Sequence, residues 1–594
     1  MASFNLPELL HILSTGIHDR KTLFNLCLVS KAFNEIFSEY YYQELFFCER
    51  NGDWLSDNTK FRLLALNRRC LNHVKHFTFC AYADTDLNTV HHVQAASHPS
   101  EVCQSLGWWL TVSSHVTILL RHMPRLESFT WVGYPLDVQV TEELQVNCPR
   151  LKSLTVVEPQ NRNLRQGLEV DLFHLPVRSP DQAQWQFLTQ SRARVPALLP
   201  FRNLKRLHLH HMWGADLGLW RNMIVQVLIN SPGLLDLGLS LSGSTRWRLS
   251  NFNLHQNDPA RHPAHFLREL CRLYRESGGE PLKLKALHLG HYMFVLRARN
   301  SPRRYRPEFA DEHENGGHLD ALVDRSSVRE LTMDLINDGG FPGDIPNALN
   351  GYDNVLWWPT APGPMPKLEK LSVRMPTSWF VRWAKRVTET GAPLRQIRVN
   401  EAAFPGSHNY PLYHAHSSNI AVNWTHLLAC KPKELMFFRA SRNAISFNEA
   451  TACKSIRYLA TDCEPFCKDV NLLASRMPQL EGLYLMSTNS NQHPALFYDE
   501  SGGDITDIQQ EKAEWEAIVR DVANILHGLK FMRINSVTWR IDRELGLALH
   551  ELDRMENERV IPDLFKIAIP YEFDVAHAAK FWVRNRYRDD DEMM

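Results

Sequence analysis

Apolar positions recur along most of this chain in the pattern Leu-x-x-Leu-x-Leu, with other apolar residues as substitutes. The last two apolar positions alternate with other residues, as in a strand that buries one face. Segments upstream, such as Val116–Met123 and Met223–Ile229, carry apolar residues at helical spacing instead. The pattern therefore predicts repeating units of one helix and one strand. The units begin at Val74, Leu126, Leu151, Leu204, Leu234, Leu284, Val328, Leu368, Leu394, Pro432, Ile456, Leu480, Leu529 and Leu564.

Prolines distinguish these units from chance matches of the pattern. A proline stands two residues before the first apolar position at Pro124, Pro149, Pro232, Pro366 and Pro478. Because proline cannot continue a helix and biases the preceding residue towards extended geometry, it marks the change from helix to strand. Several units also start 24 or 25 residues apart. This step is typical of leucine-rich repeats, which have a strand and a helix in each repeat.

The predicted fold class is therefore α/β, with a leucine-rich-repeat solenoid over residues 74–575. Its parallel strands form the concave face and its helices the convex face. Larger gaps between units predict inserted loops near 297–317, 338–366 and 489–507, and residues 576–594 are expected to form a C-terminal cap and a charged tail. An ordinary α/β domain with parallel strands is the alternative, but it does not explain the regular step.

The first 46 residues are expected to form a separate helical head, which a linker or capping helix at 47–73 joins to the repeats. Leu6 and Leu9, and then Leu23 and Leu26, recur at helical spacing. So short a unit buries too little apolar area to be stable alone. Its remaining apolar face therefore needs cover, either from the rest of this chain or from another protein.

Two motifs in this head resemble those of an F-box. They are Leu6-Pro7-Glu8-Leu9-Leu10 at its start and Val29-Ser30-Lys31-Ala32-Phe33 near its end. One departure is Tyr40-Tyr41-Tyr42, where the family often has a tryptophan. The repeats, in turn, resemble the irregular leucine-rich repeats of fungal F-box proteins.

The resemblance implies a three-helix F-box that docks a Skp-type adaptor and, through it, a cullin scaffold. It also implies that the repeats bind an unknown protein that is to be ubiquitinated, and that this chain is not itself catalytic. A helical cap without an adaptor is the alternative for the head, and a repeat scaffold outside any ubiquitin ligase is the alternative for the chain. The residues implied in adaptor binding are Leu6, Pro7, Glu8, Leu9, Ile12, Leu13, Leu23, Leu26, Val29 and Lys31.

Strand alternation also selects candidates for substrate binding, because the residues between the apolar positions face the concave side. The basic group Lys370, Arg374 and Arg398 suits an acidic or phosphorylated segment. A solvated face of mixed charge is the alternative. The full candidate set is Arg206, His208, His210, Lys370, Arg374, Arg398 and Tyr484.

Motifs of catalysis and of cofactor binding are absent from the sequence. It has no glycine-rich phosphate loop, no Gly-x-Ser-x-Gly and no zinc-protease helix motif, so we expect neither an enzyme nor a cofactor. Two rivals stay open: an enzyme hidden in the insertions, and a small-ligand receptor that uses Trp357-Trp358. Alternation places His208, His210 and His288 on the concave face, where surface histidines without a function are favoured over a metal site.

Composition narrows the partners and the compartment. Lys+Arg and Asp+Glu both number 66, so the chain lacks the basic excess of nucleic-acid binders. No apolar run approaches the roughly 20 residues that span a bilayer, and Glu8 and His11 interrupt the first apolar stretch. Eleven cysteines in 594 residues suit a reducing compartment. We therefore expect a cytoplasmic or nuclear protein that binds neither nucleic acid nor a membrane.

Overall fold

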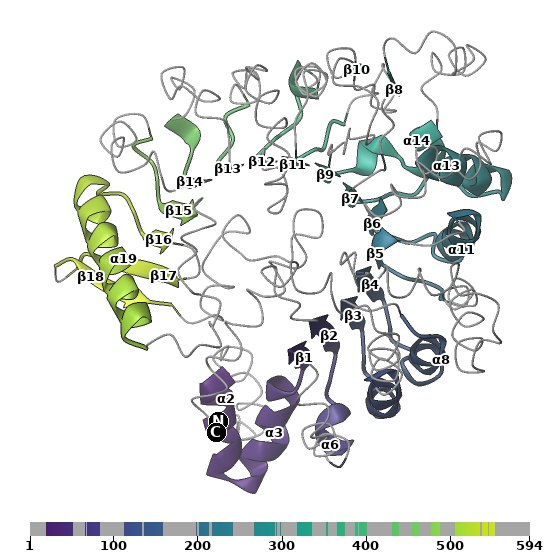
Figure 1. Ribbon diagram of the computed structural model, residues 1–594, viewed down its shortest axis with the longest axis horizontal. Coiled ribbons are helices and arrows are strands. Elements are labelled where there is room, and N and C mark those ends of the chain that lie inside the picture. Colours follow the sequence, from purple (N-terminus) through teal and green to yellow (C-terminus); the bar gives the residue numbers. More distant parts are fainter. Residues whose placement is uncertain are drawn as a thin grey trace, which may run out of the picture. The chain divides into compact units, whose positions relative to one another are not determined.

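The structure is a computed structural model (Figure 1), and the chain divides into two compact units. Unit 1 contains residues 1–325 and 337–361, and unit 2 contains residues 326–336 and 362–594. The residues that the structure describes are 20–50, 66, 68–82, 112–132, 136–157, 198, 201–212, 217–241, 266–290, 293, 297–298, 318–334, 352–353, 365–374, 387–389, 391–400, 430–438, 454–462, 477–486, 505–534, 537–544 and 546–552.

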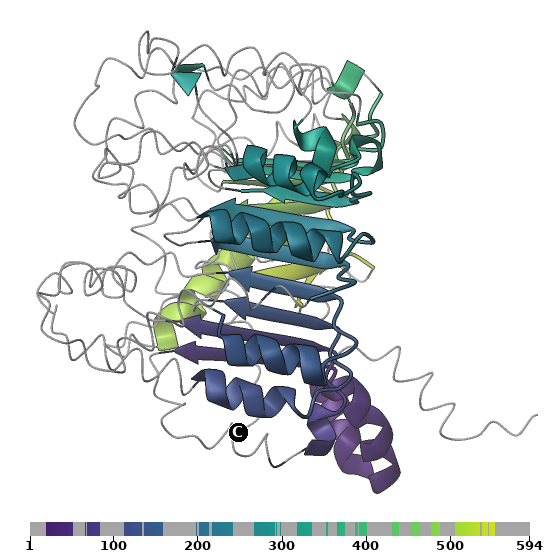
Figure 2. The same cartoon turned by 90° about the vertical axis from the view of Figure 1, so that its right-hand side faces the viewer.

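Unit 1 is built on parallel strands that follow one another in chain order. These are β1 (Glu44–Arg50), β2 (His76–Tyr82), β3 (Ser128–Val132), β4 (Ser153–Val157), β5 (Arg206–Met212), β6 (Asp236–Leu241) and β7 (Ala286–Leu289). Its helices are α2 (Arg20–Val29), α3 (Lys31–Tyr41), α6 (Arg68–Leu71), residues 112–120, α8 (Val138–Asn147), α11 (Leu217–Ile229), α13 (Phe266–Glu276) and α14 (His318–Leu322). Helices α8, α11 and α13 lie along one face of these strands (Figures 1 and 2).

Unit 2 is also built on parallel strands in chain order, but it ends in two strands that pair antiparallel. Its parallel strands are β9 (Glu330–Asp334), β11 (Lys370–Arg374), β12 (Gln396–Asn400), β13 (Glu434–Phe438), β14 (Tyr458–Asp462), β15 (Gly482–Met486) and β16 (Phe531–Ile534). The long helix α19 (Ile505–Ile525) precedes β16. Strands β17 (Val537–Asp542) and β18 (Ala548–Glu551) then pair antiparallel. The short 3₁₀ helix η8 (Arg325–Ser327) lies in the sequence where unit 1 passes into unit 2.

The apolar repeat pattern forms the core of both units. In the repeat that starts at Leu126, the side chains of Leu126, Phe129 and Trp131 are all buried. Aromatic rings continue this core across strands, since Phe77 meets Phe129 edge to face at 5.6 Å between ring centroids. The predicted strands are confirmed in every repeat from the one at Val74 to the one at Leu529, whereas the repeat at Leu564 lies outside the described residues.

The prolines stand in tight turns between helix and strand. The backbone N–H of Leu126 donates to the Met123 carbonyl at 3.1 Å, which makes Pro124 the second residue of a four-residue turn. The same bond, from Leu234 to Ser231 at 3.0 Å, encloses Pro232. Proline suits this turn position because its ring fixes the φ angle that the turn requires. The helices expected upstream are also present, as residues 112–120 and α11.

Several elements differ from the sequence-based expectation or extend it. Strand β1 begins at Glu44, where the head and its linker were expected, and pairs in parallel with β2. Helix α19 begins at Ile505, inside the loop predicted at 489–507. The insertions near 297–317 and 338–366 meet, because β8 (Arg297–Ala298) pairs antiparallel with β10 (Tyr352–Asp353). The predicted tail at 576–594 lies outside the described residues.

Among the described helices, none has both the length and the apolar composition that a membrane crossing requires.

Candidate functional site

The helices α2 and α3 form a tight pair at the start of the described chain. Ser30 separates them: its side-chain oxygen accepts the Phe33 backbone N–H at 3.2 Å and caps α3. Leu23 of α2 and Phe37 of α3 are buried against each other, with Leu26, Cys27, Phe33, Ile36, Tyr40 and Tyr41 packed around them. The Val-Ser-Lys motif thus corresponds to a helix boundary with a polar cap.

The residues expected to bind an adaptor occupy different environments within this pair. Leu23 is core and Leu26 is half-buried, whereas Val29 and Lys31 are exposed. Leu28 and Val29 at the end of α2 are 69% and 63% exposed, which is unusual for neighbouring large apolar side chains. The other candidates lie outside the described residues: Leu6, Pro7, Glu8, Leu9, Ile12 and Leu13. The described part of the head contains the two helices α2 and α3, and the three-helix arrangement stays a prediction.

Both the backbone and an ion pair attach the head to the first repeats. Glu39 of α3 pairs with Arg125, in the turn before β3, at 2.9 Å. The Gln43 carbonyl, just past α3, accepts the backbone N–H groups of Lys75 and His76 at 2.8 and 3.0 Å. Helix α3 therefore leads directly into the first strand and also covers the start of the repeats.

The substrate-binding candidates of unit 2 lie on neighbouring strands. Lys370 and Arg374 are on β11, and Arg398 on β12 is the register partner of Ser372, midway between them. Lys370 faces the Glu330 carboxylate of β9 at 3.7 Å. The register therefore brings the predicted basic group together, with an acidic neighbour beside it.

Tyr484 belongs to a different part of unit 2. The guanidinium of Arg533, on the adjacent strand β16, lies 4.8 Å from the centre of its ring. Arg533 is buried, and burial lowers the pKa of its guanidinium although Tyr484 acts in the opposite direction. The phenol ring therefore stacks on a cation of its own chain.

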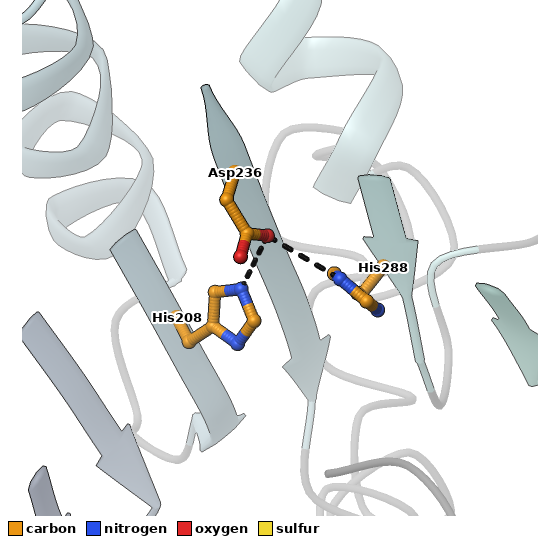
Figure 3. Close-up of side chains that lie close together, drawn as sticks. All are labelled: His208, Asp236 and His288. Atoms are coloured by element: carbon orange, nitrogen blue, oxygen red, sulfur yellow. Dashed lines mark hydrogen bonds and ion pairs between the residues drawn. The ribbon is translucent and has the colours of Figure 1, made fainter. Parts of the chain in front are cut away.

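The candidates of unit 1 belong to a cluster that spans three strands. The register pairs His208 on β5 with Gly238 on β6, and Gly238 with His288 on β7. Asp236 lies two residues before Gly238, so its side chain lies on the same face of the sheet as the two histidines. Figure 3 shows the Asp236 carboxylate between the two imidazole rings. The sheet register alone brings these three residues together.

A single carboxylate oxygen receives both histidines. His208 Nε2 lies 2.7 Å from Asp236 Oδ1, and His288 Nε2 lies 3.3 Å from the same oxygen. The other carboxylate oxygen, Oδ2, accepts a hydrogen bond from Arg206 Nε at 2.6 Å. One acceptor group on β6 therefore serves three donors on the two flanking strands, two on β5 and one on β7.

The cluster is buried, which determines its charge state. His208 and His288 are only 1% and 8% exposed, so the expectation of surface histidines is wrong. Burial lowers the pKa of His208 below its usual range, against the opposing effect of Asp236. Burial alone would raise the pKa of Asp236, but the hydrogen bonds from the two histidines hold it well below its usual range. At neutral pH we therefore assign an ionised Asp236 and a neutral His208.

His210 extends the cluster along β5. Its side chain is buried, its Nδ1 hydrogen-bonds the Ser240 hydroxyl at 3.2 Å, and its ring meets that of His208 edge to face at 5.3 Å. Sequence reasoning selected Arg206, His208, His210 and His288 but did not select Asp236. Aligning the repeat units would have revealed it, because Asp236 is the register partner of Arg206.

Comparison with known proteins yields a solved structure but no family. No family model matches the chain, and no curated protein matches it. A chain of the crystal structure of the Rad7 and Elc1 complex in yeast is similar over 77% of this chain and 90% of its own length. The two share 12% sequence identity with a TM-score of 0.32. A similarity of this degree carries no conclusion about function.

Proposed function

We propose that this chain is the substrate-recognition subunit of an SCF-type ubiquitin ligase. Its head would bind a Skp-type adaptor, which in turn binds a cullin, and its repeats would bind the protein to be ubiquitinated. The chain itself would perform no chemistry. Holding a substrate near the ubiquitin-charged enzyme raises the effective concentration of the reacting groups, and this effect is what a two-ended receptor supplies.

The exposed end of α2 is the observation that carries this proposal. Leu28 and Val29 present neighbouring apolar side chains next to the Ser30 cap, at the start of the motif that resembles an F-box and begins at Val29. The core of the pair is already filled by Leu23 and Phe37, so these exposed residues are not needed for its packing. An adaptor groove would remove them from water at about 25 cal/mol per Å² of apolar area.

The repeats support the second half of the proposal. Strands in register place polar residues on one face, such as Lys370 and Ser372 on β11 beside Arg398 on β12. A face of this kind suits an extended partner with acidic groups, because guanidinium and ammonium groups pair with carboxylates and phosphates.

A co-purification experiment with the full-length chain and a recombinant Skp-type adaptor tests the adaptor half. The variant Leu28→Glu/Val29→Glu should weaken adaptor binding by about 100-fold or more, because an unpaired carboxylate in an apolar interface costs about 3 kcal/mol. Both positions are exposed, so the melting temperature should stay within about 1–2 °C of wild type, as expected for a substitution on the surface. The pair Leu6→Ala/Pro7→Ala should weaken binding as well.

Val146 on α8 offers a matched control, because it is 76% exposed and equally apolar. Val146→Glu should bind the adaptor as wild type does. Equal binding by the wild type and the Leu28→Glu/Val29→Glu variant would exclude the proposed interface.

A repeat scaffold outside any ligase is the second candidate, and one observation favours it. The Glu39–Arg125 ion pair and the Gln43 hydrogen bonds make the head a cap on the first repeats. This candidate predicts that no Skp-type adaptor co-purifies with the wild-type chain under any condition.

A further inference from the structure

We propose that His208, Asp236 and His288 form a binding site for a divalent transition-metal ion, with Zn²⁺ as the natural occupant. This site belongs to the repeat strands of unit 1 and does not depend on the role proposed for the head. Within the part of the chain that the structure describes, no other group of three His, Cys, Asp or Glu side chains brings its ligand atoms this close together.

The first argument is convergence. Each residue offers one ligand atom, and these atoms all lie within 4.8 Å of one another. Tetrahedral zinc with bonds of about 2.0–2.1 Å holds its ligands about 3.4 Å apart. The His288 Nε2 to Asp236 Oδ1 distance of 3.3 Å already has this value, and the His208 distance of 2.7 Å needs a shift of about 0.7 Å to reach it. The metal would enter where the two imidazoles now face Oδ1 (Figure 3).

The donor set determines the class of metal. Two imidazole nitrogens with one carboxylate oxygen suit zinc and its first-row neighbours, whereas Mg²⁺ and Ca²⁺ prefer ligands that are all oxygen. Since three protein ligands leave a tetrahedral ion with one further position, water or a group of a bound partner would complete the coordination. Zinc sites with three protein ligands commonly have this arrangement.

The surroundings orient the ligands. Arg206 Nε holds the second oxygen of Asp236 at 2.6 Å and leaves Oδ1 to face the histidines. Ligating carboxylates are commonly fixed by such a hydrogen bond. The Arg206 side chain is 48% exposed, so solvent screens part of its repulsion on an incoming cation. Gly238, between the two histidines in the register, leaves room above the strand for the His208 ring.

A purely structural cluster is the rival interpretation. In that case the Nε2–H groups of both histidines simply donate to Asp236, and the carboxylate is satisfied without any ion. The two interpretations differ in what a conservative substitution does. His288→Gln keeps an N–H donor for Asp236 but replaces a strong zinc ligand by a weak one.

The test uses the full-length protein, stripped of metal by a chelator and dialysed. Zinc is then titrated in competition with a chelator, so that only tight sites on this histidine-rich chain register. Wild type should bind one equivalent with a dissociation constant below about 1 µM, and Zn²⁺ but not Mg²⁺ should raise its melting temperature. Bound Co²⁺ should give the visible absorption of a tetrahedral site.

His288→Gln and Asp236→Asn should each lower zinc affinity by about 100-fold or more. Even residues that only hydrogen-bond to a zinc ligand contribute about 10–100-fold to metal affinity, and a direct ligand should contribute at least as much. The control His550→Gln changes an exposed histidine of β18 and should bind as wild type does. Wild type that binds no tight equivalent, or whose melting temperature Zn²⁺ leaves unchanged, would overturn the proposal. The wild-type titration decides the matter even where a variant does not fold.

Discussion

The imidazole of His208 fills the space that a side chain at Gly238 would need. The two residues are register partners on β5 and β6, and a Cβ atom built on Gly238 would lie 2.8 Å from His208 Cγ. The backbone of Gly238 shows no positive φ, so the glycine serves the close approach of the ring and not a turn. This glycine is therefore part of the histidine–aspartate cluster although it contributes no polar group.

Gly238→Ala should destabilise unit 1 by about 1–3 kcal/mol, because an added methyl in a packed site forces side chains off their preferred positions. The displaced His208 ring should also weaken the hydrogen bond to Asp236. Urea unfolding of the full chain measures the loss. His208→Ala removes the clash, so adding Gly238→Ala to that variant should cost no further stability; an additive loss would contradict the contact.

Ser231 connects the turn of one repeat to the start of the neighbouring strand. Its hydroxyl oxygen accepts the backbone N–H of Leu204 at 3.1 Å, and both residues are buried. Ser231→Ala leaves that N–H without its acceptor, so we expect a loss of about 1–3 kcal/mol in the free energy of unfolding. Chemical denaturation followed by circular dichroism is the measurement. Ser277→Ala, at an exposed position after α13, should change stability by less than about 0.5 kcal/mol.

The repeat strands could be predicted because burial of one face leaves a strong signal in the sequence. In β7, for example, Leu287 and Leu289 are both buried, and Leu284 before them marks the turn. Strand β1 was missed for a physical reason. Leu45 and Phe47 are buried with the right alternation, but no proline and no preceding repeat step identify them.

The candidate site could be predicted only in part. Alternation correctly separates His208 from the buried Leu207 and Leu209, but it does not say whether the opposite face is covered. The role of Asp236 depends on contacts across two strand pairs, and its pKa depends on His208 and His288, which lie about one and two repeats away in sequence. Which residues meet across strands depends on the pairing register of neighbouring strands, and the apolar pattern of a single strand does not contain it.

Two buried thiols should resist alkylation in the folded protein. Burial raises the pKa of Cys148 and of Cys271 to about 12, and both are free thiols. At pH 8 each of the two thiols would be ionised in roughly one molecule in 10⁴, and the thiolate is the reactive form. Iodoacetamide labelling with peptide mapping should therefore modify both only after unfolding. Cys27, which is half-buried, should react faster under native conditions, and early labelling of Cys271 would contradict its burial.

Glu481 joins three strands of unit 2 through charged neighbours. Arg457 Nε donates to its Oε1 at 2.7 Å, and Lys530 Nζ lies 3.3 Å from its Oε2. Burial alone would raise the pKa of Glu481, but hydrogen bonds from Arg457 and Lys530 outweigh it and lower the pKa below the ordinary 4.5.

A carboxyl group whose pKa is lowered by folding stabilises the protein above its unfolded pKa, and this stability is lost as the pH falls through the folded pKa. Glu481→Gln should therefore lower the melting temperature at pH 7 by about 1–3 °C, a size that fits partly exposed ion pairs. Below the folded pKa of Glu481 the difference from wild type should disappear, because the wild-type side chain is then neutral too. Calorimetry across this range measures it. Glu514→Gln, an exposed change on α19, should show no such pH dependence, and a difference that persists in acid would mean that packing, not charge, holds Glu481 in place.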